Sequence, residues 1–500
     1  MSDPLKASRP TTAFRGAFLT VGMRWTDRLL GLISTMILAR LLVPEDFGLV
    51  SMAMVFAGLV DVLLDLGVGV ALVQNSRADS EDFHTAWTLR ICQATAAAIV
   101  LVVSATFVAR YYGDERVVSI LHVVAITAFI GGFENIGIVS FQKNMEFGRD
   151  FQFLFLKRGF AVAFTITAAF VLRSYWALVL GNLVSRLAGV GISYWMSRFR
   201  PRISFARFSG VWAFSQWNML RAIGENLASG VGRFVVGRRA DATVLGAYSM
   251  GEDIALMPTT ELLAPLGRVM FPVFVAAMRN GEELLRVVRL SLSVQALVAV
   301  PAGVGVALVA RDAMYVLLGE KWLSAAPFAQ IIALASIATA LAHSAIYMLA
   351  ALGRMRLLAA YNWSKVVLLV GLVVVIFPDS GARSVALAYL GTSFGGLVAI
   401  QILARRAVPG FGGRVMLLGI WRPLLAAGVM TAAVLAISQF LESASPLLRV
   451  LVEVLTGVFV YALTIAVLWR IAGSPAGAET YLLDKLAIAT RAYSAAGREP

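Results

Sequence analysis

Residues 447–470 read LLRVLVEVLTGVFVYALTIAVLWR and contain only three charged side chains. A run of this length, coiled at about 1.5 Å per residue, crosses a hydrocarbon core about 30 Å thick. Similar runs of roughly 18–26 residues recur along the whole chain, whereas the strands of a membrane barrel would be alternating runs of about ten residues. The sequence therefore predicts an all-α integral membrane protein.

The composition supports this class. Of the 500 residues, 59% are hydrophobic and 14% are charged, and the mean hydropathy is +0.81. A soluble domain carries about a quarter charged residues. Because no soluble fold hides so much apolar surface, lipid must surround the chain.

We expect about fourteen transmembrane helices. The two least hydrophobic candidates, residues 211–237 and 244–272, are polar for membrane helices. The candidate spans are 17–40, 48–73, 84–109, 117–141, 153–172, 175–197, 211–237, 244–272, 288–310, 325–351, 359–377, 383–404, 420–440 and 447–470.

The net charge of +14 indicates orientation rather than nucleic-acid binding, because basic residues gather in cytoplasmic loops. With the N-terminus inside, the inner segments carry about twice as many Lys and Arg as the outer loops. Arg198, Arg200, Arg202 and Arg207 lie in one inner segment. We expect both termini in the cytoplasm and the first apolar run to be a retained helix.

The scarcity of metal-ligating residues argues against a metal site or a cofactor. Cys92 is the only cysteine, which excludes an internal disulfide, and His84, His122 and His343 are far apart in sequence. We expect no metal and no cofactor.

A weak internal repeat appears when the chain is shifted by 198 residues. Gly48, Ser51 and Met52 then fall on Gly246, Ser249 and Met250, and Asp27 falls on Glu225. Six spans separate the copies, as in transporters built from parallel repeats. We expect two pseudo-symmetric six-helix lobes around a central cavity plus two C-terminal helices. The expected segments are the N-lobe 1–197, a basic cytoplasmic linker 198–210, the C-lobe 211–404, helices 13 and 14 at 405–470, and a cytoplasmic tail 471–500.

Charges inside the spans mark candidate functional residues, because an ionisable side chain at mid-bilayer costs several kcal/mol. The first span carries Arg24, Asp27 and Arg28 on one face, with Gly31 and Thr35 on the same stripe. The seventh span repeats the pattern. We expect substrate-binding roles for Arg24, Arg28, Arg221, Arg233 and Lys365, and coupling or orienting roles for Asp27, Glu225, Asp61 and Glu252. For Asp61, Asp65 and Glu134, hydrogen bonds between helices are favoured over contact with a ligand.

A cavity with an excess of arginine selects an anion, since guanidinium binds phosphate through paired donors. Asp27 and Glu225 could orient the arginines or take up a coupling proton, and the residues alone leave both roles open.

The run Ala39–Val50, ARLLVPEDFGLV, closely resembles the signature after the first helix of bacterial Wzx-type polysaccharide flippases. These belong to the multidrug/oligosaccharidyl-lipid/polysaccharide exporter superfamily. Residues 65–74, DLGVGVALVQ, resemble the end of that family's second helix, and 237–239 with 245–249 resemble the repeat counterpart.

The resemblance implies a flippase of the bacterial inner membrane that works by alternating access. Its implied substrate is an oligosaccharide repeat unit on undecaprenyl diphosphate, destined for exopolysaccharide, O-antigen or capsule. It implies that Arg24 and Arg28 hold the diphosphate and that a polysaccharide polymerase and co-polymerase are partners. No nucleotide-binding motif is present, so a proton or sodium gradient is the ordinary remaining driving force.

Three alternatives compete with this interpretation. A cation-coupled multidrug antiporter of the same superfamily would favour an acidic cavity, which the arginines of the first span argue against. A lipid II flippase shares the plan. A membrane enzyme would need a long outer loop carrying catalytic groups, whereas every outer loop here is short, so we expect no enzymatic activity.

Overall fold

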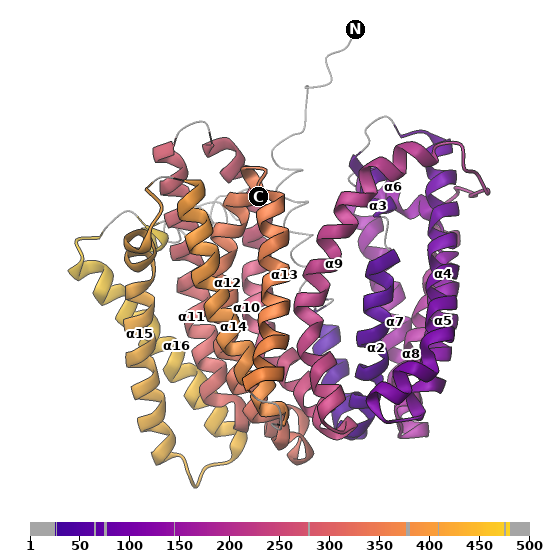
Figure 1. Ribbon diagram of the computed structural model, residues 1–500. Helices are drawn as coiled ribbons and strands as arrows, with labels where there is room; N and C mark the ends of the chain where they lie inside the picture. Colours follow the sequence, from indigo (N-terminus) through magenta and orange to yellow (C-terminus); the bar gives the residue numbers. More distant parts are fainter. Residues whose placement is uncertain are drawn as a thin grey trace, which may run out of the picture. The chain divides into compact units, whose positions relative to one another are not determined.

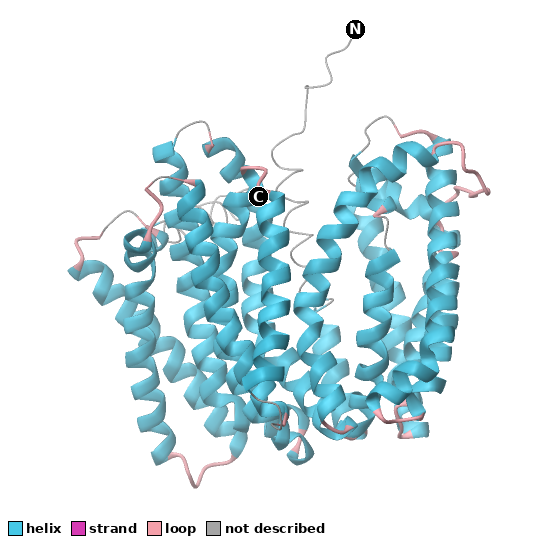
Figure 2. Cartoon of the chain, in the orientation of Figure 1, coloured by secondary structure: helices cyan, strands magenta, loops and turns pink. Residues whose placement is uncertain are grey.

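The computed structural model describes residues 26, 28–64, 67–74, 78–144, 146–278, 281–376, 381–408, 410–474 and 477–480. These residues form helices joined by short loops and contain no strand (Figures 1 and 2). The all-α prediction is therefore confirmed for this part of the chain.

A helix described over 26 and 28–41 comes first, and most later candidate spans also correspond to one helix. The span 48–73 instead covers a helix that ends at 64 and another that begins at 68, and the span 117–141 is broken after 132. The remaining elements are α2 (Pro44–Leu64), α3 (Val68–Gln74), α4 (Ser80–Tyr112), α5 (Arg116–Gly132), η1 (Ile136–Ile138), α6 (Val139–Lys143), α7 (Phe147–Leu172), α8 (Trp176–Met196), α9 (Phe208–Arg239), α10 (Ala242–Ala277), α11 (Gly281–Leu318), η2 (Glu320–Ala325), α12 (Ala326–Ala351), α13 (Met355–Gly371), η3 (Leu372–Ile376), α14 (Ala382–Ala407), α15 (Gly413–Phe440) and α16 (Pro446–Ile471).

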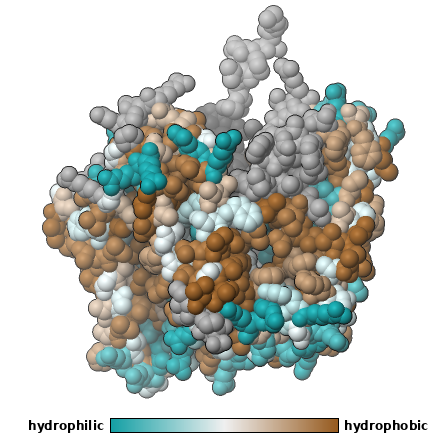
Figure 3. Space-filling model, in the orientation of Figure 1, coloured by the Kyte–Doolittle hydropathy of each residue, from teal (hydrophilic) through white to brown (hydrophobic). Residues whose placement is uncertain are grey.

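Ten helices of the described chain are long and apolar enough to cross a membrane. The number is up to eleven if Arg116–Gly132 and Ile136–Lys143, which are bent by 63°, count as one span. The two polar spans form α9 and α10, which have 32 and 36 residues but are not among the ten. Apolar side chains dominate the visible middle of the helices and hydrophilic ones gather toward their ends (Figure 3). The chain is a multi-pass membrane protein, and the finer count of fourteen stays a prediction.

The chain divides into two compact units, Met1–Gly246 and Ala247–Pro500. The boundary falls inside α10, later than the basic linker at 198–210, and the finer division into lobes and two extra helices stays a prediction.

In unit 2 the core surrounds α12, and 72% of the residues in the most apolar 18-residue stretch of this span are buried. Its buried face is rich in alanine, including Ala329, Ala333 and Ala338. Small side chains let membrane helices approach closely and gain packing energy. By contrast, only 22% of the residues in the most apolar 18-residue stretch of α16 are buried, as expected for a helix with a broad lipid-facing surface.

Unit 1 contains a close helix crossing between repeat-related positions. Helices α2 and α10 begin at Pro44 and Ala242, which are 198 residues apart (242 − 44). A Cβ at Gly48 would collide with the carbonyl oxygen of Ala242, and a Cβ at Gly246 would collide with that of Pro44. Only glycine fits at either position, and the contact is reciprocal, as two copies of one motif would make it.

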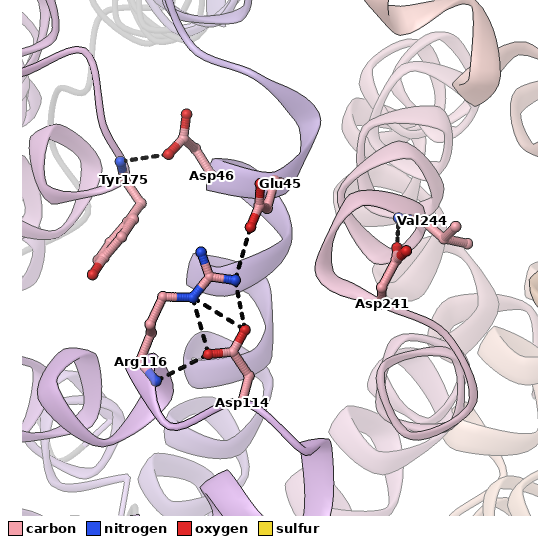
Figure 4. A network of polar contacts seen from close by, with 7 residues as sticks. All are labelled: Glu45, Asp46, Asp114, Arg116, Tyr175, Asp241 and Val244. Atoms are coloured by element: carbon pink, nitrogen blue, oxygen red, sulfur yellow. Dashed lines mark hydrogen bonds and ion pairs between the residues drawn. The ribbon is translucent and has the colours of Figure 1, made fainter.

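The same two helix starts are capped in complementary ways. Figure 4 shows the bond at α10, together with a second bond of Asp46, which accepts from the N–H of Tyr175 at 2.8 Å. At α2 the Asp46 carboxylate accepts from the backbone N–H of Val43 at 3.1 Å. At α10 the Asp241 carboxylate accepts from the N–H of Val244 at 2.8 Å. Under the 198-residue shift Val43 corresponds to Asp241 and Asp46 to Val244, so each start keeps one half of a capping box.

Candidate functional site

The predicted site residues are divided between the two units. Arg24 and Asp27 lie outside the described residues, and Arg221 and Glu225 lie on α9 outside the side chains that the structure describes. In unit 1, Arg28 and Arg233 are half-buried and Asp61 of α2 is exposed; in unit 2, Glu252 of α10 is buried and Lys365 of α13 is half-buried. A shared cavity lined by these residues stays a prediction.

Two of the predicted elements have defined surroundings. On the first helix, a Cβ at Gly31 would collide with the guanidinium of Arg158 in α7, so the stripe carrying Arg28 faces α7 at this level. On α13, the Lys365 ammonium lies 5.7 Å from the centroid of the Tyr361 ring. The aliphatic part of Lys365 passes close to Gly396 of α14.

A charge cluster that the sequence analysis did not assemble lies inside unit 1. The Glu134 carboxylate lies 2.9 Å from Nζ of Lys157 and 3.3 Å from Nη2 of Arg90. The Glu134 side chain is 6% exposed, against 20% for Lys157 and 25% for Arg90. The expectation that Glu134 links helices is confirmed, because its partners lie on α7 and α4.

Arg186 of α8 lies beside this cluster. A Cβ at Gly131, three residues before Glu134, would lie 3.4 Å from Cδ of Arg186. One turn further along α8, a Cβ at Gly189 would lie 2.9 Å from Cε of Lys157 and 3.0 Å from Oε2 of Glu134. Glycine at both positions makes room for long charged side chains.

The cluster sits at a break in a membrane helix. Helix α5 ends at Gly132, and the chain turns by 63° before η1 and α6. Asn135 caps the next segment: its side-chain oxygen accepts from the N–H of Gly137 at 2.9 Å, and its own N–H donates to Oγ of Ser193 at 2.9 Å. The backbone groups freed by the break thus find partners inside the protein, as they must at membrane depth.

A cleft of about 620 Å³ lies beside this helix break, where α4 and α7 begin and α8 ends. Its lining includes Asp79, Phe83, Gly137, Arg149, Ser197 and Arg198. Asp79 is the N-cap of α4, and the hydrogen bond from the N–H of Asp82 holds the pKa of the Asp79 carboxyl below its ordinary value. Gly137, three residues from Glu134, connects this lining to the helix break.

The basic linker runs along the start of α4. The N–H groups of Arg202 and Ser204 donate to Nδ1 of His84 and Oγ1 of Thr88, at 3.0 and 2.9 Å. The His84 ring stacks on Phe199 with centroids 5.0 Å apart. These bonds satisfy the linker backbone with side chains of one helix, so the linker is part of unit 1.

Comparison with solved structures assigns the fold. The chain superposes on the lipid II flippase MurJ in its inward-closed conformation with a TM-score of 0.74 at 12% identity, covering 91% of this chain and 99% of that one. An inward-facing multidrug transporter of the MATE family, MOP superfamily, gives 0.62 at 15% identity over 77% and 95%. The protein therefore has the fold of a MOP-superfamily transporter.

The sequence assigns the family within this class. The model of the polysaccharide biosynthesis protein family matches residues 37–327, and the chain belongs to this family. The lipopolysaccharide biosynthesis protein WzxC of Escherichia coli is 23% identical over 79% of this chain and 81% of its own length. The succinoglycan biosynthesis transport protein ExoT of Rhizobium meliloti is 26% identical over 60% of this chain and 62% of its own length. ExoT is named a transport protein, and the two superposed structures are a flippase and a transporter rather than enzymes, which agrees with the expected absence of enzymatic activity.

Proposed function

We propose that this protein is a flippase that moves undecaprenyl-diphosphate-linked oligosaccharide repeat units from the cytoplasmic to the periplasmic leaflet of the bacterial inner membrane. The family match over residues 37–327 carries the proposal. The superposition on a solved lipid-linked substrate flippase supports it at the level of the fold.

The charges inside the helices support an anionic substrate. In unit 1 the described helices place Arg28, Arg90, Lys157 and Arg186 among apolar residues, where Glu134 is the buried carboxylate that pairs with Arg90 and Lys157. Arginine and lysine bind phosphate through charge-assisted hydrogen bonds. A transporter for organic cations needs the opposite sign, and this disfavours the multidrug antiporter.

The proposed architecture has two six-helix lobes around a cavity, followed by α15 and α16, with both termini in the cytoplasm. Arg24 and Arg28, helped by Arg221, Arg233 and Lys365, hold the diphosphate in the inward-open state. Asp27, Glu225, Asp61 and Glu252 orient these cations or carry a coupling proton or sodium ion. The polyprenyl tail stays in lipid while the headgroup crosses, and a polymerase with its co-polymerase then receives the product.

Deletion of the gene tests the proposal. We expect polymer to be lost and an undecaprenyl-diphosphate-linked oligosaccharide to accumulate in the cytoplasmic leaflet, where mass spectrometry of extracted lipids identifies the glycan. Normal polymer with no accumulated intermediate would overturn the proposal. Restored growth of a strain depleted of its peptidoglycan flippase would instead indicate a lipid II flippase, the second candidate, which the superposition on MurJ favours.

A further inference from the structure

We propose that Arg90, Lys157 and Arg186 form an anion-binding site at the break after α5, which takes a phosphate or carboxylate group of the transported lipid-linked glycan. The site lies within unit 1 and was not among the predicted substrate-binding residues. The inference rests on the proposed function, since it names where the negative charge of that substrate is held.

The three cations lie at the same depth. Arg90 is ten residues after Ser80, where α4 begins, and Lys157 is ten residues after Phe147, where α7 begins. Arg186 is ten residues before Met196, where α8 ends. Because these three helix ends surround one cleft, and each residue of an α-helix advances about 1.5 Å, each cation lies about 15 Å along its helix from the same end.

The cations outnumber the acids at this level. Both oxygens of Glu134 are engaged, one by Arg90 and the other by Lys157. Across the described residues, no carboxylate forms an ion pair with Arg186. Among the described residues of this cluster, three positive charges around one negative charge leave a net charge of +2, and a half-buried excess of this kind is costly until an anion compensates it.

The surroundings are shaped to hold these side chains. Gly131 and Gly189 lack the Cβ atoms that would touch Arg186, Lys157 and Glu134. Along the same face of α8, Ser193 receives the N–H of Asn135, and Ser197 fills the space beside Gly137. This face of α8 therefore follows the broken helix from the charge cluster to the cleft.

A helix break at membrane depth is itself characteristic of transport sites. Discontinuous helices in transporters present backbone groups and charged side chains to substrates and ions near the bilayer midplane. The cleft of about 620 Å³ opens at the end that the loop charges assign to the cytoplasm, where the lipid-linked glycan is made available. Glu134 then acts as a resident counter-ion that keeps Arg90 and Lys157 extended until an anion arrives.

A titration of the purified full-length protein in detergent tests the site. Thermal stability is measured against sodium pyrophosphate in one arm and sodium glucuronate in the other, at constant ionic strength. We expect Arg186→Gln to weaken binding of one probe at least tenfold, because a charge-assisted hydrogen bond is lost, and Arg186→Lys to keep binding within a few-fold. Arg110→Gln changes an exposed cation of α4 and serves as the matched control.

The two arms separate the sources of the anion. Protection by pyrophosphate alone assigns the site to the carrier diphosphate, and protection by glucuronate alone assigns it to an acidic sugar. Equal affinity in wild type and Arg186→Gln, equal losses in Arg186→Gln and Arg110→Gln, or no binding of either probe to the wild type would overturn the proposal. If Arg186→Gln does not fold, Lys157→Gln replaces it, and unchanged binding in Lys157→Gln refutes the site.

Failure of the site and failure of the proposed function give different results. Arg186-dependent binding without a lipid-linked intermediate in the deletion strain would refute the function and keep the site. An accumulated intermediate with Arg186-independent binding would keep the function and refute the site.

Discussion

Gly48 and Gly246 occupy equivalent positions of the internal repeat, and each packs against the first turn of the other's helix. Leucine at either position would force the starts of α2 and α10 apart, since the opposing atoms are backbone and cannot rotate away. Overpacking of this kind costs about 1–3 kcal/mol. We expect Gly48→Leu and Gly246→Leu to lower thermal stability in detergent, measured by differential scanning fluorimetry. Gly58→Leu, where a Cβ meets nothing within 4 Å, is the control and should melt like the wild type.

Removal of the buried carboxylate should reveal the charge of the cluster. Glu134→Gln leaves Arg90 and Lys157 without their counter-ion, and breaking a buried pair costs about 3–5 kcal/mol. We expect a lower melting temperature than for Glu115→Gln, which changes an exposed acid at the start of α5. Pyrophosphate or glucuronate should stabilise Glu134→Gln more than wild type, because the added anion replaces the lost one. A variant that melts early and ignores both anions would indicate a purely structural ion cluster.

The arginines of the first helix should be needed for export but not for folding. Arg24→Ala and Arg28→Ala each remove a cation that we propose holds the diphosphate. We expect polymer export to fall to the level of the deletion strain while the membrane still contains folded protein, measured by polysaccharide yield and by fluorescence-detected gel filtration. Arg110→Ala should export normally. Export at the wild-type rate from both Arg24→Ala and Arg28→Ala would remove them from the site.

The loop between α4 and α5 should give a pH-dependent contribution to stability. The Arg116 guanidinium donates three hydrogen bonds to the Asp114 carboxylate, and these hold the pKa of that carboxyl below its ordinary value of 3.8. The same guanidinium also pairs with Glu45 at 2.8 Å (Figure 4). A lowered folded-state pKa gives stability that is present above the unfolded value and lost as the pH falls through the folded value. We expect wild type to be more stable than Asp114→Asn at pH 6 and the difference to shrink below about pH 4. Parallel melting curves at all pH values would contradict the assignment.

The basic linker should detach from α4 when the His84 ring nitrogen that accepts its hydrogen bond is removed. His84→Phe keeps the stacking on Phe199 but removes the nitrogen that accepts from the N–H of Arg202. We expect faster tryptic cleavage after Arg198 or Arg202, followed by gel electrophoresis and mass spectrometry; Arg200 precedes Pro201 and is not a tryptic site. His122→Phe, which changes an exposed histidine of α5, should be cleaved at the wild-type rate.

Much of the fold could be predicted from the sequence because lipid imposes a simple rule on helix length and polarity. Most apolar runs correspond to one helix, whereas the breaks after α2 and α5 were not predicted. The 198-residue shift matched Gly48 with Gly246, which the structure places in contact. The family could also be recognised from ARLLVPEDFGLV at 39–50, and the family model confirms it.

The charge cluster could not be assembled from the sequence. The predicted spans began at 84 and 153, whereas α4 begins at Ser80 and α7 at Phe147. With those bounds Arg90 and Lys157 lie six and four residues from the end of a span, where long cations reach the headgroups at little cost. Their partner Glu134 is 44 residues from Arg90 (134 − 90) and 23 from Lys157, and a single sequence contains no signal that pairs them. Gly131 and Gly189 make the space around Arg186 and Lys157, and nothing in the sequence distinguishes them from glycines that only pack helices.

The linker that crosses the start of α4 has a consequence for how the protein is made. Its backbone bonds go to His84, Thr85 and Thr88, all of which are synthesised more than a hundred residues earlier. The ribosome releases the linker when these acceptors already stand in the membrane, so residues 197–207 can dock before α9 exists. The linker can thus bind to α4 during translation, before the second half is synthesised. The second half is then inserted after a linker that is already held in place.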